Sequence, residues 1–442
     1  MFHFFKSLNF LLFLTAVKIP FNSLAQVDRT LVDQLLFDKH EIYKEKAIQH
    51  RRFKHKDIIP LIKKMPFDKK IIGKSFEGRY IYQITLGEGP IVALFWSQMH
   101  GDEPTATMAL MDLLNWFAAD DEFNELRGEI LTNMTLHIVP MLNPDGAERY
   151  IRRTSLGIDM NRDALRLQNP ESKILKQLQD EYKPEISYNL HDQSTRYSVG
   201  MTPKQATISF LASSYNYERS WNDSRIRAAQ LICSMNESLQ KFIPGHVGKY
   251  NDDHEPRAFG DNIAKWGSSL ILIESGGYKD DTEKQFIRKL NFVAIISSLI
   301  AAVEGSYTRY TLEDYHEIPQ NERYLFDLLI RNVTFEENGI RITKDIGINI
   351  NEVTTDDYMS FTLDSRIVDL GDLSIFYGIE ELDAQGMKVS NLSNFNDLAK
   401  KFKYTEVSKK LPELNTKDNF VLVKDGNPVW VVSNGKLHKV KQ

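Results

Sequence analysis

Short apolar runs alternate with stretches of helical periodicity between Ile71 and about Gly305. Each run has the length of a strand that is buried on both faces. The runs lie at residues 91–96, 136–142, 186–190 and 270–273, and apolar residues recur at helical spacing in 109–117, 171–182, 219–242 and 282–303. Because strands and helices alternate, the sequence predicts an α/β fold with a mostly parallel (mixed) sheet flanked by helices.

The pattern before this region is different. Residues 26–70 are basic and helix-like around 31–52, and we expect an N-terminal helical extension there. The alternating region is then the main domain, at 71–306. A chain of 442 residues exceeds what one hydrophobic core usually organises, so a second domain is expected.

The pattern changes again after about Tyr307, where the apolar runs become short and β-like. The turn residues Asp425-Gly426-Asn427 predict a hairpin between the runs 420–423 and 429–432. We therefore expect a small β-rich C-terminal domain at 324–442.

The first 25 residues have the pattern of an export signal. Lys6 precedes an apolar stretch at 8–17, and Ser23-Leu24-Ala25 has the small residues of a cleavage site. The apolar stretch is shorter than the roughly 20 residues needed to span a bilayer. The run at 292–303 is interrupted by serines. We expect a secreted or periplasmic protein that has no membrane span once the signal, 1–25, is removed.

Charge and cysteine content narrow the choice of partners. Removal of the signal takes away Lys6 and Lys18, so the formal net charge of -5 becomes -7. A negative net charge argues against a nucleic-acid partner. The single cysteine, Cys233, cannot form an internal disulfide, and the 42% apolar content is sufficient for an ordinary core.

Polar residues lie where the predicted strands end. His100, His191 and Glu274 each come at or just past the end of an apolar run, which is where open α/β sheets bind ligands. Glu103 follows His100 by three residues, so a single turn can direct both side chains at the same point in space. Two imidazoles, one carboxylate and an open position for water are the ligand set of catalytic zinc sites. Glu274 ends a buried run, where the alternative is a structural salt bridge.

Several motifs occur in an order that resembles the zinc carboxypeptidase family, the carboxypeptidase A-like metallopeptidases. The resemblance covers about 78–303 and does not reach the C-terminal domain. The motifs are His100-Gly101-Asp102-Glu103, Asn143-Pro144-Asp145-Gly146, Gly157-Ile158-Asp159-Met160-Asn161-Arg162, Asn189-Leu190-His191 and Ile273-Glu274-Ser275. From the residues alone, the second motif is a structural turn.

The resemblance implies one Zn²⁺ per catalytic domain, held by His100, Glu103 and His191. It assigns the general base to Glu274, which would take a proton from a water whose pKa zinc lowers toward about 7. It also implies an arginine that stabilises the developing oxyanion. Alignment with the family motif favours Arg152 for this role. The adjacent Arg153 is the alternative, and Arg149 is a more distant one.

The same resemblance implies the substrate contacts. Asn161 and Arg162 match the pair that binds a free C-terminal carboxylate, which a guanidinium can hold with two hydrogen bonds. Asp159 matches the carboxylate that orients the imidazole of His100.

The sequence departs from the family where a mobile tyrosine is usual, because no tyrosine lies in register in 248–260. Tyr250 is near enough to take this position if the loop is shifted relative to the family. His254 and Arg257 are the alternatives for the tyrosine's hydrogen bond to the substrate.

The sequence thus predicts a secreted zinc metallocarboxypeptidase acting on peptide or protein C-termini. One alternative is a cell-wall peptide (muropeptide) amidohydrolase, and another is an enzyme that deacylates small N-acyl amino acids. A further alternative is a non-catalytic binding protein on the same scaffold, with the C-terminal domain as its attachment module. The binding protein is disfavoured because every metal and base position is intact.

Overall fold

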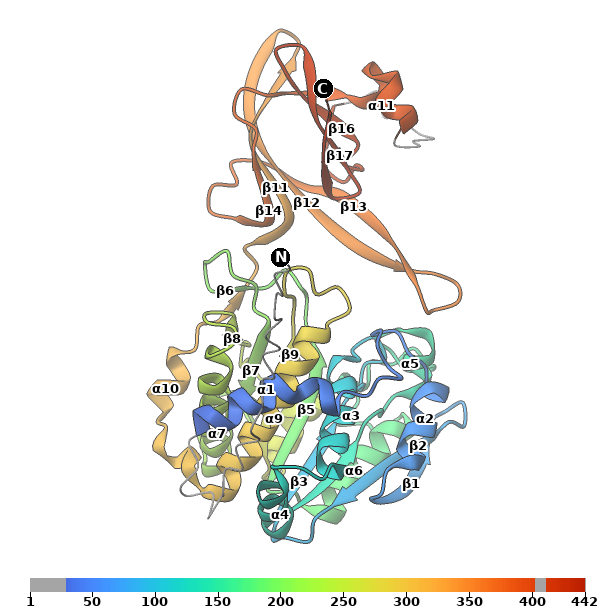
Figure 1. The fold of residues 1–442 in the computed structure, drawn as a ribbon, viewed down its shortest axis with the longest axis vertical. Coiled ribbons are helices and arrows are strands. Elements are labelled where there is room, and N and C mark those ends of the chain that lie inside the picture. Colours follow the sequence, from blue (N-terminus) through green and yellow to red (C-terminus); the bar gives the residue numbers. More distant parts are fainter. Residues whose placement is uncertain (1–28, 402–410, 442) are drawn as a thin grey trace, which may run out of the picture.

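The apolar runs of the central region form neighbouring strands of a mixed sheet in the computed structural model, which describes residues 29–401 and 411–441 (Figure 1). Within those residues the sheet has eight strands, in the order β1-β2-β4-β3-β5-β9-β7-β8. Strands β4, β3, β5 and β9 are parallel, and β2 and β7 run antiparallel to their neighbours in this group. The strands are β1 (Asp68–Lys74), β2 (Tyr80–Leu86), β3 (Ile91–Trp96), β4 (Met134–Val139), β5 (Ile186–Asp192), β7 (Ile208–Ala212), β8 (Val247–Lys249) and β9 (Ser269–Ser275). The predicted α/β class with a mostly parallel, mixed sheet is confirmed.

Helices cover both faces of this sheet, and they lie close to where the sequence places them. The longer ones are α3 (Thr105–Ala118), α6 (Pro170–Tyr182), α7 (Asp223–Gln240) and α9 (Gln285–Glu304). The shorter ones are α4 (Asn124–Asn133), α5 (Pro144–Arg149), α8 (Phe259–Lys265) and α10 (Leu312–Glu317). All four predicted strands and all four predicted helices are present.

The predicted N-terminal helical region is only partly helical. Helix α1 (Arg29–Tyr43) ends early, and α2 (His55–Lys64) begins after an irregular segment, so the helix-like reading of 31–52 is wrong beyond Tyr43. The buried guanidinium of Arg288 explains this break, because it donates to the carbonyl of Glu45 at 3.0 Å and to that of Ile48 at 2.6 Å. The carbonyl of Ile48 is therefore bound to a side chain, and that of Glu45 is shared between this guanidinium and the N–H of Ile48. The predicted signal, 1–25, lies outside the described residues.

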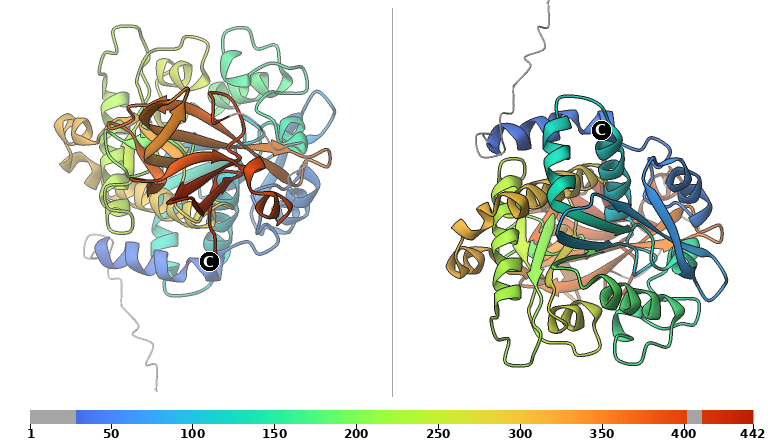
Figure 2. Two further views of the ribbon diagram at one scale, coloured as in Figure 1. Left: turned by 90° about the horizontal axis from the view of Figure 1, so that it is seen from above. Right: turned by 90° about the horizontal axis from the view of Figure 1, so that it is seen from below.

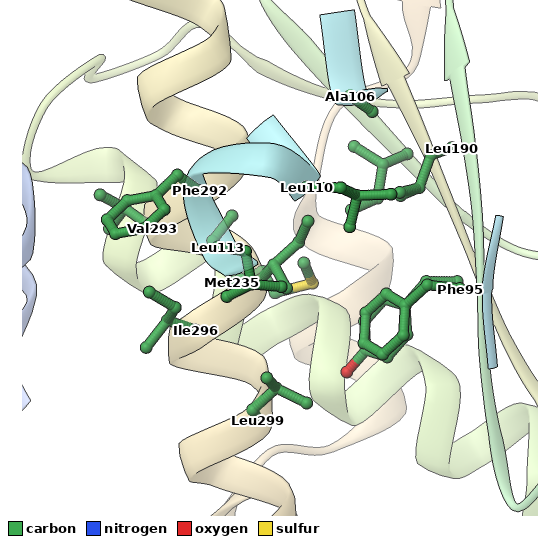
Figure 3. Packing of buried hydrophobic residues seen from close by; sticks show 14 of the residues in the cluster. Phe95, Ala106, Leu110, Leu113, Leu190, Met235, Phe292, Val293, Ile296 and Leu299 are labelled. Carbon is green, nitrogen blue, oxygen red and sulfur yellow. The ribbon is translucent and has the colours of Figure 1, made fainter. Parts of the chain in front are cut away.

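The main core lies between the sheet and helices α3, α7 and α9. Leu110 of α3 lies toward Leu190 of β5 (Figure 3), and residues of α9 such as Ile296 belong to the same apolar cluster. Leu94 points to the opposite face, against α6 and α8, as the twofold period of a strand requires. Such a strand, buried on both faces, has the continuous apolar sequence that predicted it.

Helix α9 is apolar because it is part of this core. Among the described residues it is the one helix long and apolar enough, by length and composition, to cross a membrane. Within its most apolar window, 83% of the residues are buried inside the molecule.

The C-terminal region forms a second sheet, in agreement with the predicted β-rich region. The strands are β11 (Leu325–Glu337), β12 (Ile340–Thr354), β13 (Phe361–Gly371), β14 (Tyr377–Asp383), β15 (Lys388–Asn391), β16 (Phe420–Lys424), β17 (Asn427–Ser433) and β18 (Lys436–Lys439). The predicted hairpin is β16–β17, in which Lys424 pairs with Asn427 around Asp425 and Gly426. Both turn residues have positive φ, 50° and 78°, and glycine adopts such a conformation without strain.

The second sheet lies beyond the carboxyl ends of the parallel strands of the first (Figures 1 and 2). Arg196, in the loop that follows β5, donates to Asp327 at 3.0 Å and to the carbonyl of Ile350 at 2.9 Å. The long β12–β13 hairpin reaches back toward α2 and α5, where Arg51 and Arg52 pair with Glu352. The second sheet is thus fixed over the edge of the first sheet that carries the predicted site. The boundaries proposed at 71–306 and 324–442 stay predictions.

Candidate active site

Three strand ends bring the predicted residues together. His100 lies in the turn between β3 and α3, His191 is near the end of β5, and Glu274 is near the end of β9. His191 and Glu274 are paired residues on adjacent parallel strands, so their backbones are neighbours. The order of the strands in the sheet therefore places one imidazole directly beside the predicted base.

The turn that carries His100 is shaped by the Asn143-Pro144-Asp145-Gly146 motif. This segment is the beginning of α5, where the Asn143 side chain accepts from the N–H of Gly146 at 2.9 Å and donates to the carbonyl of Met99 at 3.2 Å. A Cβ atom on Gly101 would lie 2.0 Å from the backbone of Gly146. Both glycines are therefore required for the close approach that directs His100 inward, and the motif has a structural role, as the residues predicted.

His100, Glu103 and His191 converge on one point. Nδ1 of His100 lies 2.7 Å from one carboxylate oxygen of Glu103, and Nδ1 of His191 lies 2.6 Å from the other. The two Nδ1 atoms are 3.2 Å apart, and all three side chains are buried. Two nitrogen donors and a carboxylate oxygen directed at a common centre are the chemistry that a zinc ion requires.

The electrostatics of this group favour a cation. Burial opposes a charge on His100, but the Glu103 and Asp159 carboxylates outweigh it and raise the pKa of His100 to about 9. Burial also opposes ionisation of Glu103, yet the two imidazoles hold its pKa below the usual value. Positive charge is therefore needed at this point, and the residues present fit a divalent ion.

Glu274 lines the same cavity as the three donors. Its Oε2 atom is buried and has no hydrogen-bond partner among the described residues. Burial, and then the nearby charge of Glu103, raise the pKa of Glu274 well above its ordinary value. The alternative of a structural salt bridge is not what the structure shows, since no cationic side chain of the described residues pairs with it.

Of the three arginines that the sequence left open, Arg152 is the one at the site. Its Nη1 donates to Nδ1 of His100 at 3.1 Å and to Glu103 at 3.3 Å, and its Nε donates to Asp159 at 2.9 Å. Arg153 donates instead to the carbonyl of Gly157 at 3.1 Å, and Arg149 pairs with Glu77. Adjacent side chains in the loop diverge, which is why sequence register alone could not separate Arg152 from Arg153.

Asp159 lies on the outer side of His100. Its carboxylate is 3.2 Å from Nε2 of His100, the ring atom opposite the one that faces Glu103. It also accepts from the N–H of Asn161 at 2.9 Å. Asp159 is therefore placed to fix the ring orientation and tautomer of His100, the position that the resemblance implied.

Asn161 and Arg162 line the cavity on another side. The side chain of Asn161 accepts from the N–H of Phe259, the first residue of α8, at 2.9 Å. The guanidinium of Arg162 lies 3.3 Å from Glu255 and donates to the carbonyl of Asn161 at 2.7 Å. Asn161 is held by the backbone of Phe259, whereas the charge of Arg162 is paired with the partly exposed carboxylate of Glu255.

Tyr250 also lines the cavity, and of the three candidates for the tyrosine position it is the one that does. Its ring meets that of Tyr197 edge-on, with centroids 6.0 Å apart. Burial and the charge of Glu274 raise the pKa of Tyr250. His254 instead lies 3.3 Å from Asp261, and Arg257 pairs with Glu255 at the surface.

Three further residues support the site and were not found from the sequence. The carboxylate of Asp192 accepts from Thr105 at 2.6 Å and from Lys284 at 3.1 Å, and Lys284 also donates to the carbonyl of Ser275 at 3.0 Å. This buried ion pair joins the ends of β5 and β9 to the start of α9. Asp192 had a signal, because it directly follows His191 at the end of an apolar run. Lys284 and Tyr197 had none, since their contacts are distant in sequence.

Two histidines and a glutamate at strand ends, beside a second glutamate, are the ligand set and base that catalytic zinc sites use. Residues 66–192, which include His100, Glu103 and His191, match the model of the zinc carboxypeptidase family. The family resemblance predicted from the motifs is confirmed for this segment. The family is zinc-dependent, and the three buried donors provide the corresponding site.

Two named carboxypeptidases are similar in sequence to part of this chain. Carboxypeptidase SOL1 of Arabidopsis thaliana is 33% identical over 24% of this chain and 24% of its own length. Carboxypeptidase 2 of Trichophyton rubrum is 29% identical over 26% of this chain and 20% of its own length. The chain thus spans a quarter or less of the length of these relatives.

Solved structures show a distant likeness. A metallo-carboxypeptidase from Burkholderia cenocepacia has a TM-score of 0.47 and 14% identity, over 57% of this chain and 70% of its own. Carboxypeptidase A from Helicoverpa armigera has a TM-score of 0.43 and 14% identity, over 63% of this chain and 81% of its own.

Proposed function

We propose that this protein is an exported zinc metallocarboxypeptidase that removes residues from the C-termini of peptides or proteins. The observation that carries the proposal is a cavity of about 370 Å³ lined by the three donors, Glu274, Arg152 and Arg162. A metal group, a base and a cation that can bind a carboxylate thus face the same space.

His100, Glu103 and His191 would hold one zinc ion in this cavity. When bound, zinc supplies Lewis acidity, which polarises a carbonyl and lowers the pKa of a water to about 7. Asp159 keeps the ring of His100 oriented so that Nδ1 faces the ion.

Glu274 takes the proton of the attacking water and then gives it to the leaving amine. Glu274 lines the cavity from the strand beside His191, and one of its carboxylate oxygens is buried with no hydrogen-bond partner among the described residues. A carboxylate whose pKa is raised is a stronger base, and catalysis of this kind is most effective when the pKa lies near the working pH. The guanidinium N–H groups of Arg152 lie beside His100 and Glu103. There they stabilise the negative charge that develops on the carbonyl oxygen of the substrate.

Arg162 and Asn161 recognise the free terminal carboxylate of the substrate. A guanidinium binds a carboxylate with two parallel hydrogen bonds, which gives both affinity and orientation. Arg162 is already 3.3 Å from the carboxylate of Glu255, so the substrate replaces one anion by another. Tyr250 lines the same cavity and brings a hydroxyl group to it.

Export is part of the proposal because the motif of residues 1–25 supports it. The reaction would then take place in the periplasm or outside the cell, on peptides that reach the protein there.

The test is digestion of a peptide library by the zinc-loaded protein, with each peptide present as a free acid and as a C-terminal amide. The account predicts products shortened by one C-terminal residue from the free acids only, and an Arg162→Ala variant that loses most of this selectivity. Equal cleavage of amides and acids would show that the carboxylate contact does not operate. Purified muropeptides in the same assay identify a cell-wall substrate if they alone are cleaved.

A further inference from the structure

A second cavity, of about 460 Å³, lies between the loop that follows β5 and the C-terminal sheet. Ser194 and Tyr197 line both this cavity and the one that contains the metal donors. The two cavities are therefore neighbours with a common wall. The lining of the second cavity comes from the loop that follows β5 and from β11, β12 and β13 of the C-terminal sheet.

The C-terminal sheet builds the far side of this second cavity. Phe326 on β11, Asn349 on β12 and Phe376 before β14 all line it. The rings of Phe326 and Phe376 are 5.4 Å apart and belong to one apolar cluster. The near side is held in place by Arg196, whose guanidinium is bound to Asp327 and to backbone of β12. Both sides are thus built from ordered, mutually bonded elements.

The position of the first cavity determines what the second receives. In the proposed function, a substrate is held by its terminal carboxylate at Arg162 and cleaved beside Glu274. Residues on the amino side of the cleaved bond must leave the first cavity elsewhere, and Ser194 and Tyr197 mark where it meets the second. We infer that the second cavity binds the upstream residues of an extended peptide, so that the C-terminal sheet is part of the substrate site. This inference rests on the proposed function.

The lining indicates which upstream residues fit best. Arg323 is exposed, donates to the hydroxyl of Tyr197 at 3.2 Å and lies 5.6 Å from the centre of its ring. Its charge is held against a neutral group that belongs to both cavities, so it is available to a carboxylate. Asn349 adds a buried side-chain oxygen that lacks a hydrogen-bond partner among the described residues, as an acceptor for a peptide N–H. An acidic side chain upstream of the cleaved bond is the preferred occupant.

Asp369 also lines the second cavity and would favour a basic residue instead. We expect Arg323 to determine the charge preference, because it contacts Tyr197, which lines both cavities. Asp369 instead lies on β13 in the C-terminal sheet. The Asp369→Asn variant checks this assignment, and we expect it to keep the preference for an acidic residue.

The experiment compares three substrates with identical last two residues: an N-blocked dipeptide, and pentapeptides with three upstream glutamates or three upstream lysines. For the unaltered protein, we expect kcat/KM for the glutamate pentapeptide to exceed that of the dipeptide at least about tenfold, since remote contacts add transition-state binding. We expect the glutamate peptide to be preferred to the lysine peptide about threefold to fivefold, the range for an exposed ion pair.

Arg323→Glu should reverse this preference and leave the dipeptide unchanged. Arg323 is exposed, so the variant is expected to fold, and its thermal midpoint is checked against the unaltered protein. The matched control is Arg341→Glu, eight residues from Asn349 along β12 and so about 26 Å away. It should change none of the three rates.

Binding of labelled pentapeptides to Glu274→Gln, followed by fluorescence anisotropy, should show the same order of affinities without turnover.

The outcomes separate the two proposals. If the dipeptide is cleaved but neither chain length nor the charge at residue 323 changes kcat/KM or affinity, the upstream site is wrong and the proposed function stands. If no free-acid peptide is shortened, the proposed function fails, and the upstream site fails with it.

Discussion

At single residues of the site, the proposed function makes protons and a metal ion compete for the same atoms. Nδ1 of His100 faces Glu103, and Nε2 faces Asp159, so both ring nitrogens lie next to a carboxylate. This surplus of negative charge is what raises the pKa of His100 to about 9 against the effect of burial. Without a metal, a proton supplies the missing charge.

The first prediction follows from that competition. Zinc needs the neutral imidazole, and His100 is protonated below a pKa of about 9, so zinc binding at pH 7 releases a proton. The apparent affinity should fall about tenfold for each pH unit below 9, from this group alone. Competition titrations with a chelator from pH 6 to pH 9 measure the slope. Asp159→Asn removes one source of the raised pKa and should flatten the slope above pH 7, and an affinity independent of pH would contradict the assignment.

A second prediction concerns Glu274. The Glu274→Gln variant keeps the volume of the side chain but cannot take a proton, so kcat should fall about 10²- to 10⁴-fold or more. Zinc content, by elemental analysis, and the thermal midpoint should stay unchanged, because Glu274 is not one of the three converging donors. Unchanged turnover in a zinc-loaded variant would remove Glu274 from the mechanism.

At the element scale, the paired positions of β5 and β9 decide the geometry of the site. Parallel pairing in register places His191 beside Glu274, and the Asp192–Lys284 ion pair holds the two strand ends to α9. Both charges of this pair are buried. A buried charge that loses its partner is costly, so the pair is a sensitive point of the structure.

The third prediction tests this pair. Lys284→Met should lower the free energy of unfolding by about 3–5 kcal/mol, because the buried charge of Asp192 loses its cationic partner and keeps only the hydroxyl of Thr105. The double variant Lys284→Met, Asp192→Asn should recover part of that loss. The matched control is Lys176→Met, which breaks the surface pair with Asp180 on α6 and should cost less than about 1 kcal/mol. Denaturant unfolding measures all of these, and equal losses for Lys284→Met and Lys176→Met would contradict the account.

The elements were predictable where local pattern decides them. Strands such as β3 are continuous apolar runs because helices cover both faces of the sheet, and these runs gave the predicted bounds. The break after Tyr43 was not predictable, because it depends on Arg288, a residue more than two hundred positions away. His191 and Glu274 were predictable because they end apolar runs, and His100 and Glu103 because their motif follows such a run and resembles that of the zinc carboxypeptidase family. Tyr197 and Lys284 were not, since only the folded chain brings them to the site.

At the scale of the whole molecule, the C-terminal sheet is held at the edge that contains the site by two sets of contacts. Arg196 binds it beside the cavity, and Arg51 and Arg52 bind Glu352 of the β12–β13 hairpin. The guanidinium of Arg52 also lies 4.9 Å from the ring of Phe361 and 3.8 Å from that of Tyr150. The N-terminal segment is therefore what anchors the hairpin to the larger part of the molecule.

The fourth prediction is that Glu352→Gln loosens this hairpin. Removal of the carboxylate leaves Arg51 and Arg52 without their ion-pair partner, so amides of β12 and β13 near the hairpin tip should exchange with deuterium faster. Hydrogen exchange with mass spectrometry measures this, and amides of β3, β5 and β9 should keep their rates. A variant with unchanged exchange in β12 and β13 would show that other contacts anchor the hairpin.

The proposed function requires that His100 and Glu103, from the turn between β3 and α3, and His191, from β5, hold a zinc ion in the cavity that contains Glu274. Anomalous diffraction at the zinc edge, from crystals of the zinc-loaded protein, shows whether this ion is present and which atoms bind it. The account predicts one peak about 2.0–2.2 Å from Nδ1 of His100, from Nδ1 of His191 and from a carboxylate oxygen of Glu103. No peak in this cavity, or a peak bound by other residues, would contradict it.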